Sequence, residues 1–145
     1  MKSKLSILLL GIAGWFASQP ANACTGITLK SKDGTTIVAR TIEWGGSNLN
    51  SQYVIVPRGY TAQSYTPEGI NGMKFTARYG YVGLAVEQKE FIAEGVNEAG
   101  LSAGLFYFPP YGKYEDYNAS EKENTTSDLQ LVSWILGNRA TLDEV

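Results

Sequence analysis

The chain has 145 residues, with 12 lysines and arginines against 14 aspartates and glutamates, so its formal net charge is −2. Without a basic excess, no nucleic-acid partner is expected. Histidine is absent and there is one cysteine, Cys24, which excludes the zinc sites built from several of these ligands. We therefore expect no metal and no cofactor. The length suffices for one small domain.

The first 23 residues have the three-part pattern of a secretory signal peptide. Lys2 and Lys4 form a positive region, residues 5–17 form an apolar core, and residues 21–23 read Ala-Asn-Ala. A membrane-spanning helix needs about 20 apolar residues, so no stable membrane span is expected. The pattern predicts cleavage directly before Cys24 and export to the bacterial periplasm or the extracellular space.

The following two thirds of the chain predict short strands punctuated by turn residues. The candidates are rich in β-branched and aromatic residues, and they are residues 25–29, 35–42, 53–56, 74–86, 91–96 and 101–108. Asp33-Gly34 predicts a two-residue hairpin turn between the first two. That turn would set Glu43 opposite Cys24. It would also set Arg40 opposite Ile27, with the Arg40 side chain on the other face of the pleat.

The last third predicts a loop and a helix. Residues 111–126 are polar and predict an exposed loop, and Asn97 before it is interpreted as a turn residue. Ser127 and Gln130 have the spacing of a capping box, and apolar residues recur at helical spacing until Gly137. A second capping box begins at Thr141 and predicts another helix, and the sequence stops within the first turn of that helix. We therefore expect the chain to be part of a longer protein.

The lone cysteine has three interpretations. By type alone, Cys24 would be a small buried hydrophobic residue at the start of a strand. Its place after a signal-like segment instead favours either a lipid-anchored binding protein or an N-terminal nucleophile. Because no histidine is present to act as a base, the α-amine of a mature N-terminal cysteine is the most economical one. Its ordinary pKa of about 7.7–8.0 leaves part of it neutral at physiological pH.

Short motifs follow Cys24 in a fixed order. They are Cys-Thr-Gly at 24–26, Asp-Gly at 33–34, Ala-Arg-Thr-Ile-Glu-Trp at 39–44, Val-Ile-Val-Pro-Arg at 54–58, Glu-Gly-Val-Asn-Glu-Ala-Gly-Leu at 94–101 and Phe-Pro at 108–109. In this order and spacing they resemble the opening of the choloylglycine hydrolase family, which includes bile salt hydrolases and penicillin V acylases. The resemblance implies an α+β fold, the αββα sandwich of N-terminal nucleophile hydrolases, in which two antiparallel sheets lie between helical layers. Residues 24–145 would be the N-terminal portion of that catalytic domain.

The resemblance also implies an activity and a set of site residues. Cys24 would be the nucleophile that hydrolyses a linear amide, Arg40 the cation beside its thiolate, and Glu43 the carboxylate that binds its α-amine. Glu43 stands where the family more often has aspartate. Tyr107 would contribute a backbone N–H to the oxyanion hole.

The implied substrate is a small-molecule amide, either a conjugated bile acid or, as the alternative, penicillin V. Tyr107 stands where bile salt hydrolases often carry asparagine and penicillin V acylases often carry tyrosine. The resemblance further implies a homo-oligomer. The family's other catalytic residues lie beyond residue 145, so residues 24–145 alone are expected to be inactive.

Overall fold

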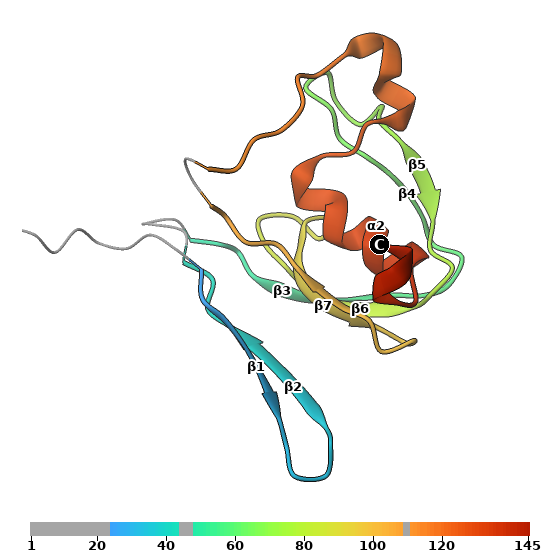
Figure 1. The fold of residues 1–145 in the computed structure, drawn as a ribbon. Helices are drawn as coiled ribbons and strands as arrows, with labels where there is room; N and C mark the ends of the chain where they lie inside the picture. Colours follow the sequence, from blue (N-terminus) through green and yellow to red (C-terminus); the bar gives the residue numbers. More distant parts are fainter. Residues whose placement is uncertain (1–23, 44–47, 109–110) are drawn as a thin grey trace, which may run out of the picture. The chain divides into compact units, whose positions relative to one another are not determined.

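The computed structural model describes residues 24–43, 48–108 and 111–145 (Figure 1). Contacts divide the chain into two compact units, Met1–Gly45 and Gly46–Val145. We call the described part of the first the hairpin unit and that of the second the main unit, and each is taken by itself. The predicted signal peptide, residues 1–23, lies outside the described residues.

The hairpin unit consists of two antiparallel strands, β1 (Gly26–Lys30) and β2 (Thr36–Arg40). Both predicted strands are confirmed, but the predicted two-residue turn is wrong. The Ser31 N–H donates to the Thr35 carbonyl at 2.9 Å, which leaves a three-residue loop, and Gly34 in that loop has φ 89°. This pattern fits a turn followed by a glycine in the left-handed region.

The Asp33 carboxylate gives the physical reason for the longer loop. It accepts hydrogen bonds from the Ser31 hydroxyl and, at 3.0 Å, from the Thr35 N–H. These bonds hold the pKa of Asp33 at about 2, below its ordinary value of 3.8. The pairing therefore differs from the predicted one by one residue, and Arg40 lies opposite Gly26 rather than Ile27.

The main unit is built on a four-stranded antiparallel sheet in the order β3-β6-β7-β8. Its strands are β3 (Gln52–Val56), β6 (Tyr81–Ala85), β7 (Ile92–Asn97) and β8 (Ser102–Gly104). A separate two-stranded sheet pairs β4 (Thr61–Gln63) with β5 (Lys74–Thr76). The predicted strands at 53–56 and 91–96 are confirmed within about one residue at each end.

Two strand predictions need correction. Residues 74–86 form two strands rather than one, because the backbone between them leaves the ladder: the N–H groups of Arg78 and Tyr79 both donate to the Gly137 carbonyl, at 2.7 and 3.1 Å. The predicted strand 101–108 is shorter in the structure, where β8 covers Ser102–Gly104. The short strand β4 was not predicted.

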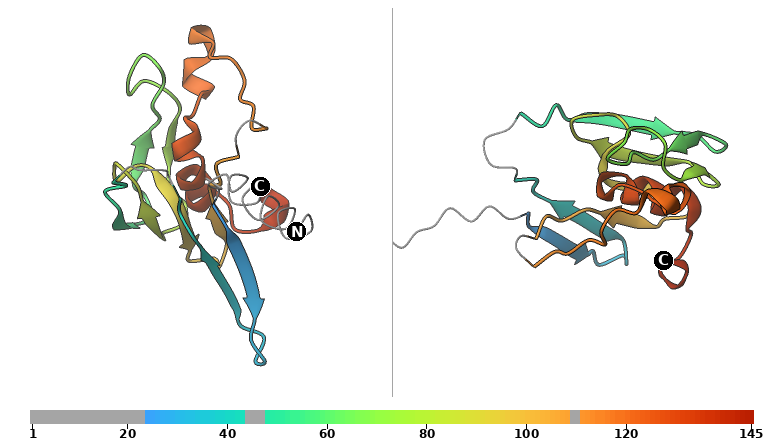
Figure 2. Two further views of the ribbon diagram at one scale, coloured as in Figure 1. Left: turned by 90° about the vertical axis from the view of Figure 1, so that its left-hand side faces the viewer. Right: turned by 90° about the horizontal axis from the view of Figure 1, so that it is seen from above.

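Helix α2 (Leu131–Asn138) packs against the sheet. The short 3-10 helix η2 (Asp128–Gln130) leads into α2, which confirms the predicted helix, and α2 contacts β7 along one face of the sheet (Figures 1 and 2). Ser127 precedes η2 as predicted, but its hydroxyl donates to the Gln130 side chain instead of capping an N–H. The buried core between helix and sheet comprises Val56, Ala77, Tyr81, Ala85, Ile92, Val132 and Leu136.

The remaining segments are short. The predicted loop at 111–126 contains the 3-10 helix η1 (Ala119–Asn124), none of whose residues is buried. Thr141 precedes η3 (Leu142–Glu144), and Glu144 reaches back to accept from the Ala140 N–H at 2.7 Å. The described residues thus form antiparallel sheets with few helices, which confirms the predicted α+β class.

Candidate active site

Cys24 lies at the open end of the hairpin, where the two strands join the rest of the chain. It is half-buried, and the strand pairing continues up to its neighbour, because the Thr41 N–H donates to the Thr25 carbonyl at 2.9 Å. Counting one pair further sets Cys24 opposite Ile42. The prediction that Glu43 would stand directly opposite Cys24 is therefore wrong by one residue.

The same one-residue shift brings Arg40 onto the face of the hairpin that carries Cys24. Arg40 is paired with Gly26, and residues paired across two strands carry their side chains on the same face. Cys24 is two residues from Gly26, so by the pleat it shares that face with Arg40 as a diagonal neighbour, typically about 7–8 Å away. Glycine at 26 adds no side chain between them. With the predicted two-residue turn, the Arg40 side chain would have lain on the other face of the pleat; with the observed register it lies on the Cys24 face.

Glu43 is connected to the backbone beside Cys24 through a hydroxyl group. The Thr25 N–H donates to Thr41 Oγ1 at 3.2 Å, and that hydroxyl donates to Glu43 Oε1 at 3.1 Å. The Arg40 Nε donates to the Thr41 carbonyl at 3.3 Å. Thr41 therefore contacts both charged candidates, although the sequence did not single it out.

The fourth candidate, Tyr107, belongs to the main unit. It lies in the segment after β8, and its side chain is 51% exposed, like those of its neighbours Phe106 and Phe108. Three of the four predicted site residues are thus gathered in the hairpin unit, and the fourth stands in an exposed aromatic stretch of the main unit.

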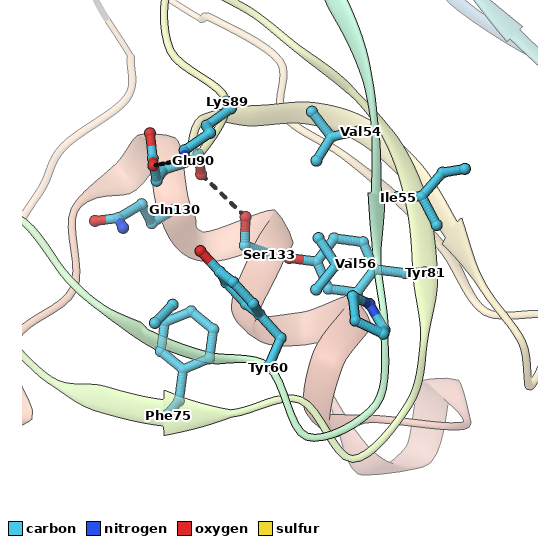
Figure 3. Close-up of a pocket in the computed structure, with 12 residues that line it drawn as sticks. Val54, Ile55, Val56, Tyr60, Phe75, Tyr81, Lys89, Glu90, Gln130 and Ser133 are labelled. Carbon is cyan, nitrogen blue, oxygen red and sulfur yellow. Dashed lines mark hydrogen bonds and ion pairs between the residues drawn. The ribbon is translucent and has the colours of Figure 1, made fainter.

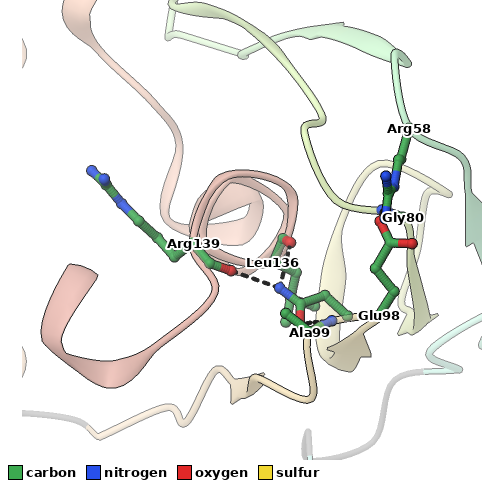
Figure 4. Close-up of polar contacts among 7 residues, drawn as sticks. Arg58, Gly80, Glu98, Ala99, Leu136 and Arg139 are labelled. Carbon is green, nitrogen blue, oxygen red and sulfur yellow. Dashed lines mark hydrogen bonds and ion pairs between the residues drawn. The ribbon is translucent and has the colours of Figure 1, made fainter.

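Two motif residues of the main unit form an ion pair that the sequence did not predict. Arg58 follows β3 and Glu98 follows β7, and the Arg58 Nε donates to Glu98 Oε1 (Figure 4). The same oxygen accepts from the Gly80 N–H at 2.6 Å. The pKa of Glu98 is lowered, chiefly by the hydrogen bond from Arg58 and to a smaller extent by the one from the Gly80 N–H. These residues join the ends of three strands, which is a role in the fold.

Asn97 is another motif residue with a structural role. Its side chain is buried, and its amide oxygen accepts from the N–H groups of Ala99 and Leu101 at 3.1 and 3.0 Å. Its amide nitrogen donates to the carbonyls of Leu136 and Arg139 at 3.0 and 2.6 Å (Figure 4). The interpretation of Asn97 as a turn residue is confirmed, and the structure adds that it binds the end of α2.

A cavity of about 200 Å³ lies in the main unit (Figure 3). Its wall is mostly apolar, with Val54, Val56, Phe75 and Tyr81 among the lining residues. Burial raises the pKa of the Tyr81 hydroxyl. None of the four predicted site residues lines this cavity.

The described residues provide no obvious metal site. Among them, no three histidine, cysteine, aspartate or glutamate side chains gather closely enough to hold an ion. Likewise, no helix in the described ranges has the length and apolar character needed to cross a membrane.

Comparison with known proteins gives the family. The model of the family described as "Linear amide C-N hydrolases, choloylglycine hydrolase family" matches residues 24–145. The chain belongs to the choloylglycine hydrolase family. The match begins at Cys24 and covers both the hairpin unit and the main unit. The antiparallel α+β arrangement is consistent with part of an N-terminal nucleophile hydrolase fold.

A curated relative agrees with this family. The chain is 27% identical over 124 residues to the bile salt hydrolase/transferase of Clostridium perfringens (strain 13 / Type A). The aligned region covers 84% of this chain and 36% of that protein, so the chain spans about a third of the relative's length. No solved structure matches the chain significantly.

Proposed function

We propose that the protein hydrolyses the linear amide bond of conjugated bile acids, with Cys24 as its N-terminal nucleophile once residues 1–23 have been removed. The observation that carries the proposal is the starting point of the family match at Cys24, directly after the Ala-Asn-Ala segment. The similarity to a bile salt hydrolase/transferase supports the choice of substrate. Export to the periplasm or the cell exterior and assembly into a homo-oligomer belong to the same proposal.

The hairpin geometry supports the assigned roles. Arg40 on the Cys24 face of the pleat is suited to stabilise a thiolate, because a nearby cation favours the charged form of a thiol. The Thr41 hydroxyl holds the Glu43 carboxylate next to the backbone at Thr25. There the carboxylate is suited to bind the ammonium form of the Cys24 α-amine.

The reaction proceeds by acyl transfer. The neutral α-amine of Cys24 takes the thiol proton, and the sulfur forms a bond to the amide carbonyl carbon. Backbone donors, with the Tyr107 N–H among them, stabilise the oxyanion. The carbon–nitrogen bond then breaks, and the departing amine takes the proton from the Cys24 ammonium. Water, losing a proton to the same α-amine, cleaves the thioester and restores the thiol.

The test uses the protein produced from its complete gene, with the mass of its mature N-terminus determined. We expect an N-terminal Cys24, turnover of glycine- or taurine-conjugated bile acids, and no turnover by Cys24→Ala. An active Cys24→Ala protein would rule out the nucleophile. A diacylglyceryl group on Cys24 would instead support a lipid-anchored binding protein.

Tyr107 favours a second candidate, the hydrolysis of penicillin V. The residue matches the one often found at this position in penicillin V acylases, and its exposed neighbours Phe106 and Phe108 are suited to an aromatic acyl group. The same preparation is assayed with both substrates. Turnover of penicillin V alone would replace the bile acid proposal and leave the role of Cys24 intact.

A further inference from the structure

The hairpin contains one hydroxyl group that joins the nucleophile's strand to the proposed amine-binding carboxylate. Thr41 Oγ1 accepts from the Thr25 N–H at 3.2 Å and donates to Glu43 Oε1 at 3.1 Å. A threonine hydroxyl has one proton to donate, so the direction of these two bonds is fixed: the backbone N–H can only donate and a carboxylate oxygen accepts. The two bonds therefore form a directed chain from the peptide N–H that follows Cys24 to the carboxylate.

These two consecutive hydrogen bonds can orient the Glu43 carboxylate, which strand pairing does not. Glu43 lies beyond the last pair of β2 and does not stand opposite Cys24, so strand pairing alone does not orient its carboxylate. The backbone of Thr41, by contrast, is fixed by its N–H bond to the Thr25 carbonyl at 2.9 Å. A side chain on that fixed position can hold the carboxylate at one rotamer.

We propose that Thr41 is a positioning residue, whose hydroxyl holds the Glu43 carboxylate beside the Cys24 α-amine. The inference rests on the proposed role of Cys24 and adds a residue to that site. In the described part of the hairpin unit, the charged residues are Arg40 and Glu43 toward the open end, where Cys24 lies, and Lys30, Lys32 and Asp33 at or near the turn end. Glu43 is thus the carboxylate in this unit that Thr41 presents to the amine.

The direction of the effect on pH dependence follows from charge. A carboxylate beside the α-amine stabilises its ammonium form, whereas the reaction needs the neutral amine as base. When the carboxylate is no longer held, the ammonium form is less stabilised and the neutral amine persists to lower pH. The acid limb of the kcat/KM profile therefore moves to lower pH.

The test compares Thr41→Val, which removes the hydroxyl but keeps the β-branched shape, with Thr41→Ser, which keeps the hydroxyl. Thr28→Val is the matched control, because Thr28 is an exposed threonine on β1 opposite Val38. Each variant is made in the complete protein as a fusion from which a protease releases Cys24 as residue one. Processing therefore does not depend on the substitution.

We expect Thr41→Val to lower kcat about 10-fold, less than the ~10²-fold or more that a general base itself contributes, with KM nearly unchanged. Its acid limb should move to lower pH, while Thr41→Ser and Thr28→Val should behave like the unmodified enzyme. Wild-type kcat and pH profile in Thr41→Val, together with an inactive Cys24→Ala, would overturn the role of Thr41. An active Cys24→Ala would instead overturn the proposed function, so the two failures are distinct.

Discussion

A single amide side chain at position 97 forms hydrogen bonds with four backbone groups. Two of these groups are N–H donors of the turn after β7, and two are carbonyls at the end of α2. Asparagine is suited to this place because its amide has two donor protons and an acceptor oxygen. Its presence in the Val-Asn-Glu-Ala-Gly motif therefore has a structural explanation, with no need for a catalytic one.

Replacing Asn97 with alanine should lower the free energy of unfolding by about 3 kcal/mol, since buried backbone groups lose their partners. Denaturant unfolding followed by circular dichroism measures the change. Asn118→Ala is the control, because Asn118 is exposed and its side chain accepts from the N–H and hydroxyl of Ser120, and the loss of that side chain should cost about 1 kcal/mol. Equal effects of the two substitutions would contradict the proposed role of Asn97.

The hydrogen bonds of Asp33 predict a pH effect at the hairpin turn. Its pKa in the folded chain is about 2, below the ordinary aspartate value of 3.8, chiefly because of the Ser31 hydroxyl. A lowered pKa means that Asp33 stabilises the turn above about pH 4, and that this contribution is lost as the pH falls toward 2. Carbon-detected NMR should give a titration midpoint near 2, and Ser31→Ala should raise it. A midpoint near 3.8 in the unmodified protein would show that the turn bonds are absent in solution.

At the scale of elements, the contact between β7 and α2 depends on a missing side chain. A Cβ added at Gly95 would lie 2.5 Å from the Val82 carbonyl oxygen and 2.7 Å from Leu136 Cδ1. The Val82 carbonyl is fixed in β6, and Leu136 is fully buried, so its side chain has little space in which to move aside. Close approach of helix and sheet therefore requires glycine at position 95.

We expect Gly95→Ala to lower the free energy of unfolding by about 1–3 kcal/mol through overpacking. Gly112→Ala is the matched control, because a Cβ there would meet only the Phe108 carbonyl oxygen, at 3.5 Å. Thermal or denaturant unfolding of both variants gives the comparison. A Gly95→Ala protein as stable as the control would mean that β7 and α2 are less closely packed than described.

Elements with a local signal could be predicted from the sequence, whereas their exact pairing could not. A local composition rich in β-branched and aromatic residues, bounded by turn residues, predicted β1, β2, β3 and β7, and helical spacing predicted α2. The hairpin register failed because Asp33-Gly34 fits turns of two or three residues, and side-chain bonds from Ser31 decide between them. The break after β5 arises from bonds to Gly137, about 60 residues further along the chain.

At the scale of the whole molecule, the face of the four-stranded sheet turned away from α2 carries an apolar patch, with Glu94 and Ser102 beside it. Ile55, Val82 and Val96 lie side by side in register across three strands, and Tyr53 lies two residues from Ile55 on the same face. Ile55 is 82% and Tyr53 86% exposed in the described chain. A contiguous apolar surface of this kind favours association.

The polypeptide 24–145 produced by itself should therefore self-associate and bind an apolar dye. Replacing Ile55 and Val82 with threonine, which keeps β-propensity, should reduce both effects. Ile70→Thr is the control, because Ile70 is 57% exposed but lies outside the sheet. Sedimentation velocity and dye fluorescence provide the measurements. If the unmodified polypeptide is monomeric and does not bind the dye, the prediction is wrong.

For the candidate site, the sequence indicated which residues to examine but not how they are linked. Cys24, Arg40 and Glu43 were found through motifs, since residue type and order suffice for that. Thr41 was missed because nothing in its type distinguishes it from the other threonines of the hairpin. Only the structure shows that its hydroxyl bonds to the backbone of one strand and the carboxylate of the other.

The three-residue loop between Ser31 and Thr35 also determines where homologous sequences can differ in length. Without Lys32, Asp33-Gly34 would form a two-residue turn directly between Ser31 and Thr35, and Arg40 would still meet Gly26. A homologue one residue shorter here would thus keep every strand pair, provided that the gap is aligned inside the loop. An alignment that moves the gap into β2 would assign each β2 side chain to the wrong face.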